Sequence, residues 1–242
     1  MEAKSSHFDN DHFKWPILSS KQQQYYLQQA QQVLTAQAKM IHSAENNLLR
    51  YTLEQTQRHI SMKHYPKGDR IDHLTGGHYF YHCHRENYST TEHGHFHCFL
   101  RQIGFPKHLI PIPSMQTPKT HPMTHLVAIS MNQLGQPIRL FTVNRWVSDD
   151  IWFGAKDQPQ LLKQFKIHLP DDSPWFLIDQ WIEGMVHLFA PQIHWLHQQR
   201  EQITKDYAMH HFEDKAIEEI SSIPINLSQQ IEWIMHDTFR TY

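Results

Sequence analysis

Histidines alternate with other residues in two short segments, and this pattern constrains the fold more than any other feature of the chain. The first segment reads HYFYHCH (78–84), and the second reads HGHFHCF (93–99). Successive side chains of a β-strand point to opposite faces, so alternate residues share a face. The histidines expected to share a face are His78, His82 and His84 in a first strand, and His93, His95 and His97 in a second.

The polar run RENYSTTE between the two segments favours a hairpin loop. If His84 lies opposite His93, antiparallel pairing places His82 opposite His95 and Phe80 opposite His97, with facing Cβ atoms about 5 Å apart. Such a group of imidazoles is suited to Zn(II), Fe(II), Ni(II) or Cu(II). We expect a divalent transition metal, Zn or Fe in the first place, bound by three or four of His82, His84, His93, His95 and His97.

Glu92 is the nearest acid to the second histidine segment. A carboxylate there can ligate the metal, orient an imidazole or act as a general base, and we predict catalytic roles for Glu92 and His95. The alternatives are a half-polar sheet surface whose histidines bind nothing, and a catalytic histidine cluster without metal. Metal binding is the preferred interpretation, because clustered imidazoles repel when protonated and leave hydrogen-bonding capacity unused when buried.

The rest of the chain predicts helices at both ends. From Ser19 to about residue 60 there is no Pro or Gly, and Tyr26, Ala30 and Val33 recur at helical spacing. The apolar runs HLVAISMN and PIRLFTVNRWV flank QLGQ and indicate a second hairpin. The expected fold is therefore α+β, an antiparallel sheet of about four or more strands flanked by N-terminal and C-terminal helices. We expect one domain over 1–242, with helical regions at 19–60 and 158–242 and the histidine-rich sheet core at 77–147.

Composition argues against several partners. Lys and Arg number 22 against 24 Asp and Glu, so no large basic field attracts nucleic acid or anionic lipid. No stretch approaches the roughly 20 apolar residues of a membrane span, and the first residues lack the apolar run of a secretory signal. Two cysteines, Cys83 and Cys98, fit a reducing compartment. A cytoplasmic protein without nucleic-acid or membrane partners is expected, and the sequence leaves its oligomeric state open.

Two arginines near the end of the second hairpin suggest a substrate. Arg139 lies in the last predicted strand, and Arg145 follows it in VNRWVSDDIW. Pockets often form at such strand ends, and a guanidinium there can bind an anionic group. We therefore predict that Arg139 and Arg145 hold a small anionic substrate.

The stretch from Tyr65 to Trp146, with YHCHRE, EHGHFHCF and THLVAISMNQLGQPIRLFTVNRWV, resembles an uncharacterised bacterial domain family. That resemblance implies a functional site but no activity. The run HGHFHCF is also similar to the histidine-triad motif, which implies a nucleotide hydrolase or transferase with the middle histidine, His95, as the nucleophile. Gly94 stands where that family has an apolar residue, and a long chain follows where that family normally ends.

Taken together, these patterns predict a metal-binding protein, and as an enzyme a mononuclear histidine-ligated hydrolase or oxygenase acting on a small anionic molecule. Two alternatives remain open. One is a metal-free nucleotide hydrolase or transferase of the histidine-triad kind, in which His95 attacks a phosphate. The other is a non-catalytic protein that sequesters or senses metal.

Overall fold

Six strands form one antiparallel sheet in the order β1-β2-β3-β4-β5-β6, so each strand pairs with its neighbours along the chain. The computed structural model describes residues 13–43, 47–53, 58–84, 91–113, 122–170, 173 and 175–236. The strands are β1 Tyr65–Ile71, β2 Gly77–Cys83, β3 Gly94–Arg101, β4 Met123–Met131, β5 Pro137–Val143 and β6 Glu219–Pro224. With helices before and after the sheet, the predicted α+β class is confirmed.

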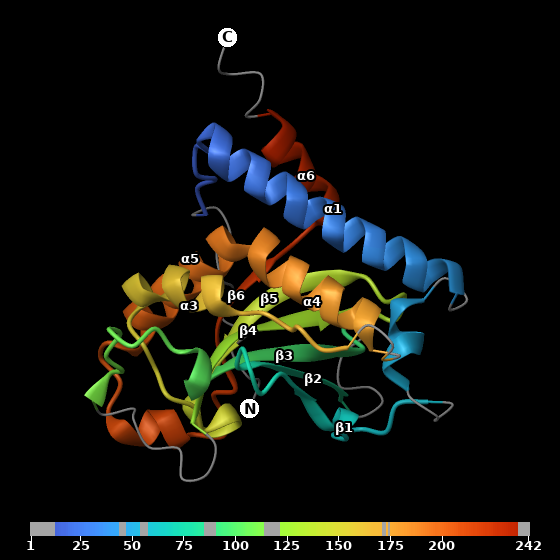
Figure 1. Cartoon of the computed structure of the whole chain (residues 1–242). Coiled ribbons are helices and arrows are strands. Elements are labelled where there is room, and N and C mark those ends of the chain that lie inside the picture. Colours follow the sequence, from blue (N-terminus) through green and yellow to red (C-terminus); the bar gives the residue numbers. More distant parts are fainter. Residues whose placement is uncertain are drawn as a thin grey trace.

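Helices cover one face of the sheet in two layers (Figure 1). Those nearest the sheet are α3 Gln158–Gln164, α4 Phe176–Leu188 and α5 Ala190–Thr204, and the outer layer is α1 Ser20–Ser43 with α6 Leu227–His236. The short helices are α2 Arg145–Ser148, η2 Leu48–Leu53, η3 Gln102–Gly104, η5 Ala155–Asp157 and η6 Met209–Glu213. Within the described part of the chain, no helix combines the length and the apolar character that crossing a bilayer requires.

Helix α1 begins where its sequence predicts, but it ends at Ser43, well before the end of the predicted helical region 19–60. The Ser19 side chain and backbone NH contact Gln22 Oε1, and the Gln22 NH donates back to Ser19 Oγ, which makes a capping box. Val33 and Met40 are fully buried and share one face of the helix. This face packs on α4 at Gly184, where an added Cβ would lie 2.7 Å from Val33 Cγ2. The glutamine-rich helix is therefore a cover over the core, held by a narrow apolar stripe.

The two faces of the sheet differ in chemistry. The face toward the helices is apolar and aromatic: the Phe96 ring lies 5.8 Å from Trp181 of α4, and Cys83 and Cys98 are buried in this core, as expected. The other face carries rows of paired residues that cross several strands. One row runs His82, His95, Ser130, Arg139, and the next runs Phe80, His97, Ala128, Phe141. The row that contains His82 and His95 therefore lies on the face away from α4.

Two strands were not predicted from the sequence. β1 precedes the expected sheet core, and β6 lies inside the 158–242 region that was expected to be helical, so this expectation is wrong for Glu219–Pro224. β1 carries Pro66, Gly68 and a register shift before Arg70, and it has few apolar residues. β6 is only 6 residues long. Both are edge strands whose conformation depends on their single neighbour more than on local preference.

A buried ion pair fastens β1 to helix α4. Arg70 donates from Nε and Nη2 to the Asp179 carboxylate, and the Tyr79 hydroxyl donates to Asp179 Oδ1 at 2.7 Å. The Asp179 side chain is 1% exposed. Three donors thus satisfy a carboxylate that burial would otherwise penalise.

Replacing Asp179 with Ala should lower the free energy of unfolding by about 3 to 5 kcal/mol, because Arg70 and the Tyr79 hydroxyl lose their buried acceptor. Urea denaturation measures this change, and Asp206→Ala, at an exposed acid, is the matched control. A loss below 1 kcal/mol for Asp179→Ala would contradict the role given to this pair.

Candidate metal centre

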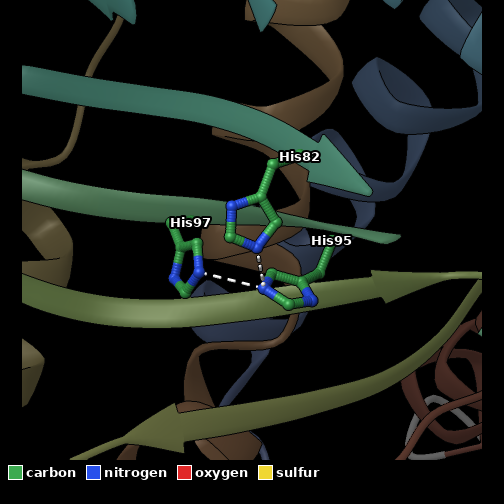
Figure 2. Close-up of side chains that lie close together, drawn as sticks. All are labelled: His82, His95 and His97. Carbon is green, nitrogen blue, oxygen red and sulfur yellow. Dashed lines mark hydrogen bonds between the residues drawn. The ribbon is translucent and has the colours of Figure 1, made fainter. Parts of the chain in front are cut away.

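Three imidazoles meet at one point on the face of the sheet away from α4 (Figure 2). His95 Nε2 lies 2.8 Å from His82 Nε2 and 2.9 Å from His97 Nε2. His82 comes from β2, whereas the other two come from alternate positions of β3. The predicted register is confirmed, since His82 pairs with His95 and Phe80 pairs with His97.

The donor set fits a transition metal ion. The three Nε2 atoms lie within 4.8 Å of one another, and all three side chains are buried. Ligand nitrogens about 2.0 to 2.1 Å from a tetrahedral ion are separated by about 3.3 Å, so sub-ångström shifts would admit one. The edge of the Phe141 ring meets His95, with the ring centroids 4.9 Å apart, so the site has an apolar side.

Glu92 holds the outer nitrogen of the central imidazole. Its Oε1 lies 2.8 Å from His95 Nδ1, while its Oε2 accepts hydrogen bonds from the Ser130 hydroxyl and from Arg139 Nη2. Burial raises the pKa of Glu92, but the hydrogen bond and charge of His95, the Ser130 hydroxyl and the charge of Arg139 together lower it to about 2. The carboxylate is therefore ionised at neutral pH and accepts a hydrogen bond from the Nδ1–H group of His95.

That proton assignment leaves a lone pair on His95 Nε2. Without a metal, the Nε2–H groups of His82 and His97 must both donate to this single lone pair. With a metal, all three Nε2 atoms supply lone pairs to the ion, and the Nδ1 proton of His97 donates to His125 Nε2 at 3.1 Å. The His125 Nδ1 has no partner among the described residues in either state. In the arrangement with a metal, each of the three Nε2 atoms is a ligand. The other ring nitrogens of His95 and His97 then donate hydrogen bonds to protein acceptors, as is usual for metal-bound histidines.

Burial favours the neutral form of His82 and His97, which is the form that binds metal. Burial first, and the neighbouring His95 and His84 next, lower the pKa of His82 to about 2. The pKa of His97 lies well below its ordinary value, because of burial first and then the neighbouring His95 and His125.

His84 belongs to a second group of possible ligands. Its Nε2 lies 3.4 Å from His95 Nδ1 and 3.6 Å from Glu92 Oε1. A cation here would displace the proton on His95 Nδ1 and lie close to the Arg139 guanidinium, which contacts Glu92 at 2.9 Å. The first group, at His82, His95 and His97, is therefore the better metal site.

His93 does not join the cluster. The expectation that it shares a face with His95 and His97 is wrong, because His93 Nδ1 contacts the Tyr81 hydroxyl at 2.6 Å and its ring stacks on Tyr81, on the helix side of the sheet. β3 begins at Gly94, so strand alternation stops there and Glu92 takes the side expected for His93. A Cβ on Gly94 would lie 2.3 Å from the His82 carbonyl oxygen, which shows how closely the two backbones approach.

His125 and Ser130 complete the surroundings. His125 belongs to β4, which lies inside the sheet, and its Nε2 lies 3.1 Å from His97 Nδ1. Sequence analysis missed Ser130, whose signal would have been its alternation with Ala128 opposite the histidine strand.

Both predicted substrate-binding arginines are paired with protein carboxylates. Arg139 of β5 contacts Glu92 at 2.9 Å and Glu219 of β6 at 2.8 Å. It therefore links the edge strand β6 to the carboxylate that contacts His95. Arg145 at the start of α2 contacts Glu213. Neither lines the cavity described next.

A cavity of about 680 Å³ adjoins the cluster, and His82, His84 and His97 lie in its wall. Its apolar wall consists of Met62, Phe80, Phe99, Met123, Trp146 and Val147. His95 and Glu92 lie behind the other histidines and are not part of this wall. The candidate metal centre therefore has hydrogen-bonded polar groups on one side and a largely apolar cavity on the other.

Comparison with known families places the whole sheet in one domain family. A family model described as Domain of unknown function (DUF6969) matches residues 27–225. The chain belongs to this family. The DUF6969 match includes every residue of the candidate centre and its cavity, and the expected membership of an uncharacterised domain family is confirmed. Searches of the curated proteins and of the solved structures found no match.

Replacing Glu92 with Gln should weaken metal binding about 10- to 100-fold, because His95 loses the charged acceptor that orients it. Competition with a chromogenic chelator measures the affinity. Glu219→Gln is the matched control, since Glu219 also pairs with Arg139 but does not touch His95. An equal loss in both variants would show that the arginine pairs, not the orientation of His95, govern binding.

The metal-free protein should lose stability on acidification. Burial first, and the charge of Arg200 second, lower the pKa of His125 to about 3, against about 6.5 in the unfolded chain. The unfolded state therefore takes up a proton below pH 6.5 that the folded state takes up only near pH 3. Between pH 7 and pH 5 this histidine alone should lower the free energy of unfolding by about 2 kcal/mol.

Urea denaturation of chelator-treated protein at both pH values checks this expectation. The His125→Leu variant should show a pH dependence smaller by about 2 kcal/mol over the same interval, because the titrating group is gone. An unchanged pH dependence in His125→Leu would contradict the assignment.

Proposed function

We propose that this protein is a metalloenzyme that binds one divalent transition metal ion, Zn or Fe, and acts on a small molecule in the adjoining cavity. The observation that carries the proposal is the convergence of His82, His95 and His97 Nε2 beside a cavity of about 680 Å³. Three neutral imidazoles with room at a fourth position are typical of catalytic sites, whereas structural zinc sites fill all four positions with protein ligands.

The ion would supply Lewis acidity and an open coordination position for water or dioxygen, as in a hydrolase or an oxygenase. The protein's part is to fix the ligands and to exclude bulk water. Glu92 keeps the Nδ1 proton on His95, and His125 does the same for His97. The pKa of Glu92, lowered to about 2, makes it a weak base, so we assign it the role of a positioning residue in place of the expected general base.

A metal-free hydrolase or transferase of the histidine-triad kind is less well supported. Phosphate groups require cationic or N–H-rich surroundings, and the described residues that line the cavity include no Lys or Arg. His95, the expected nucleophile, lies behind the wall with both nitrogens engaged. A sequestering or sensing protein remains the alternative outcome of the metal measurement.

Protein purified without a tag should contain about one equivalent of Zn or Fe per chain, because one set of three imidazoles converges among the residues that the structure describes. Inductively coupled plasma mass spectrometry measures the content. The His82→Ala/His95→Ala double variant should lose the metal, and His108→Ala/His168→Ala, at two exposed histidines, should retain it.

Three results would argue against the proposal. No metal after purification and none taken up from added ions would exclude a metal centre. Several equivalents bound per chain would favour sequestration. Equal content in the two double variants would place the ion elsewhere in the chain.

A further inference from the structure

A second polar group lies in the wall of the same cavity and takes no part in the metal centre. Asp69 of β1 contacts two imidazoles: His64 Nδ1 lies 2.9 Å from its Oδ1, and His78 Nε2 lies 3.0 Å from its Oδ2. All three residues line the cavity. Asp69 has φ of 63°, a left-handed conformation that a non-glycine residue adopts at a cost, and such strain gathers at binding and catalytic sites.

The carboxylate fixes which nitrogens of the two histidines can accept hydrogen bonds. Burial raises the pKa of Asp69, but the hydrogen bonds and charges of His64 and His78 together lower it to about 2, so it is ionised and only accepts. Both contacting nitrogens are therefore N–H donors. In the neutral imidazoles, His64 Nε2 and His78 Nδ1 must then carry lone pairs.

These two lone pairs call for hydrogen-bond donors. His78 is 3% exposed, and its Nδ1 is buried without a partner among the described residues. A buried acceptor without a donor costs free energy unless a ligand or water supplies one. His64 is held in place by stacking on Phe80, with ring centroids 3.7 Å apart and planes at 9°. The wall thus presents two oriented acceptors. His78 Nδ1 is buried and has no donor among the described residues, whereas His64 Nε2 belongs to an exposed side chain that a ligand can reach.

The rest of the cavity wall disfavours ligands with a negative charge. Phe80, Phe99 and Trp146 provide aromatic surface, while the acids Asp69 and Glu218 also line the cavity. The described lining residues include no Lys or Arg that would compensate an anionic ligand. In the metal-free protein, a ligand carboxylate or phosphate would therefore be desolvated beside protein carboxylates, at considerable cost.

We propose that the cavity selects an uncharged hydroxylated aromatic molecule, of the phenol or catechol class, whose hydroxyl donates a hydrogen bond to His64 Nε2. The aromatic ring lies against the apolar wall, between this acceptor and the histidines of the metal centre. The proposal rests on the proposed function in treating this molecule as the substrate. It replaces the small anionic substrate expected from Arg139 and Arg145, which are paired elsewhere.

Ligand-observed ¹⁹F NMR with three matched probes tests the proposal on the full-length protein, both chelator-treated and loaded with Zn. 4-Fluorophenol carries the donor, 4-fluoroanisole lacks it, and 4-fluorobenzoate is anionic. 4-Fluorophenol should bind about two- to tenfold more tightly than 4-fluoroanisole, as expected for the net free energy of one hydrogen bond, and 4-fluorobenzoate should bind most weakly in the chelator-treated protein. Equal binding of phenol and anisole, tightest binding of benzoate to the chelator-treated protein, or binding of none of the probes would overturn the proposal.

The His64→Phe variant keeps a ring against Phe80 but removes the acceptor, so it should bind phenol and anisole alike. His73→Phe, at an exposed histidine outside the cavity, should keep the preference for phenol. Metal content is measured on the same samples. A parent protein that retains metal but shows no phenol preference, or a His64→Phe variant that keeps the preference, would reject this inference alone. A phenol preference in a parent protein that takes up no metal would reject the metalloenzyme and leave the cavity's selectivity standing.

Discussion

The antiparallel pairing of β2 with β3 is the interaction on which the site depends. It sets His82 across from His95 and Phe80 across from His97, so a single register brings the ligands together and places an aromatic ring beside them. A shift by one residue would turn every histidine of one strand toward the helices. The close approach of Gly94 to the His82 carbonyl oxygen shows how tightly this register is held at the end of the hairpin.

Around this hairpin the structure separates two tasks. The helix side supplies apolar burial, with Phe96 against Trp181 and the Gln-rich α1 as an outer cover. The opposite side supplies charge and hydrogen bonds, ordered so that Glu92 faces one imidazole nitrogen and leaves the other for an ion. Arg139 pairs with the carboxylates of Glu92 and Glu219. The negative charge of the buried Glu92 is therefore compensated.

Local pattern was sufficient to predict the fold class, the two hairpins, the long N-terminal helix and the pairing of His82 with His95. These features follow from period-two or helical spacing within single segments. β1 and β6 were missed because Pro66, Gly68 and a six-residue length conceal an edge strand. The sequence did not predict that the Glu92 side chain, and not that of His93, lies on the same side of the sheet as His95. This outcome depends on β3 beginning at Gly94. The partners of Arg139 lie far apart in sequence, and only the assembled sheet brings them together. The Asp69 group is close in sequence, but it depends on the pairing of β1 with β2, which was not predicted.

All six strands of the sheet follow the order of the chain, and this has a consequence for how the proposed ion would be acquired. His82, His95 and His97 are separated by few residues, so closing the loops between them costs little entropy even before α4 and α5 have packed. An ion can meet its ligands in a partly folded hairpin and remain there while the helices assemble on the other face. Because the three histidines are close in sequence, little of the free energy of binding the proposed ion would be needed to order the chain between them.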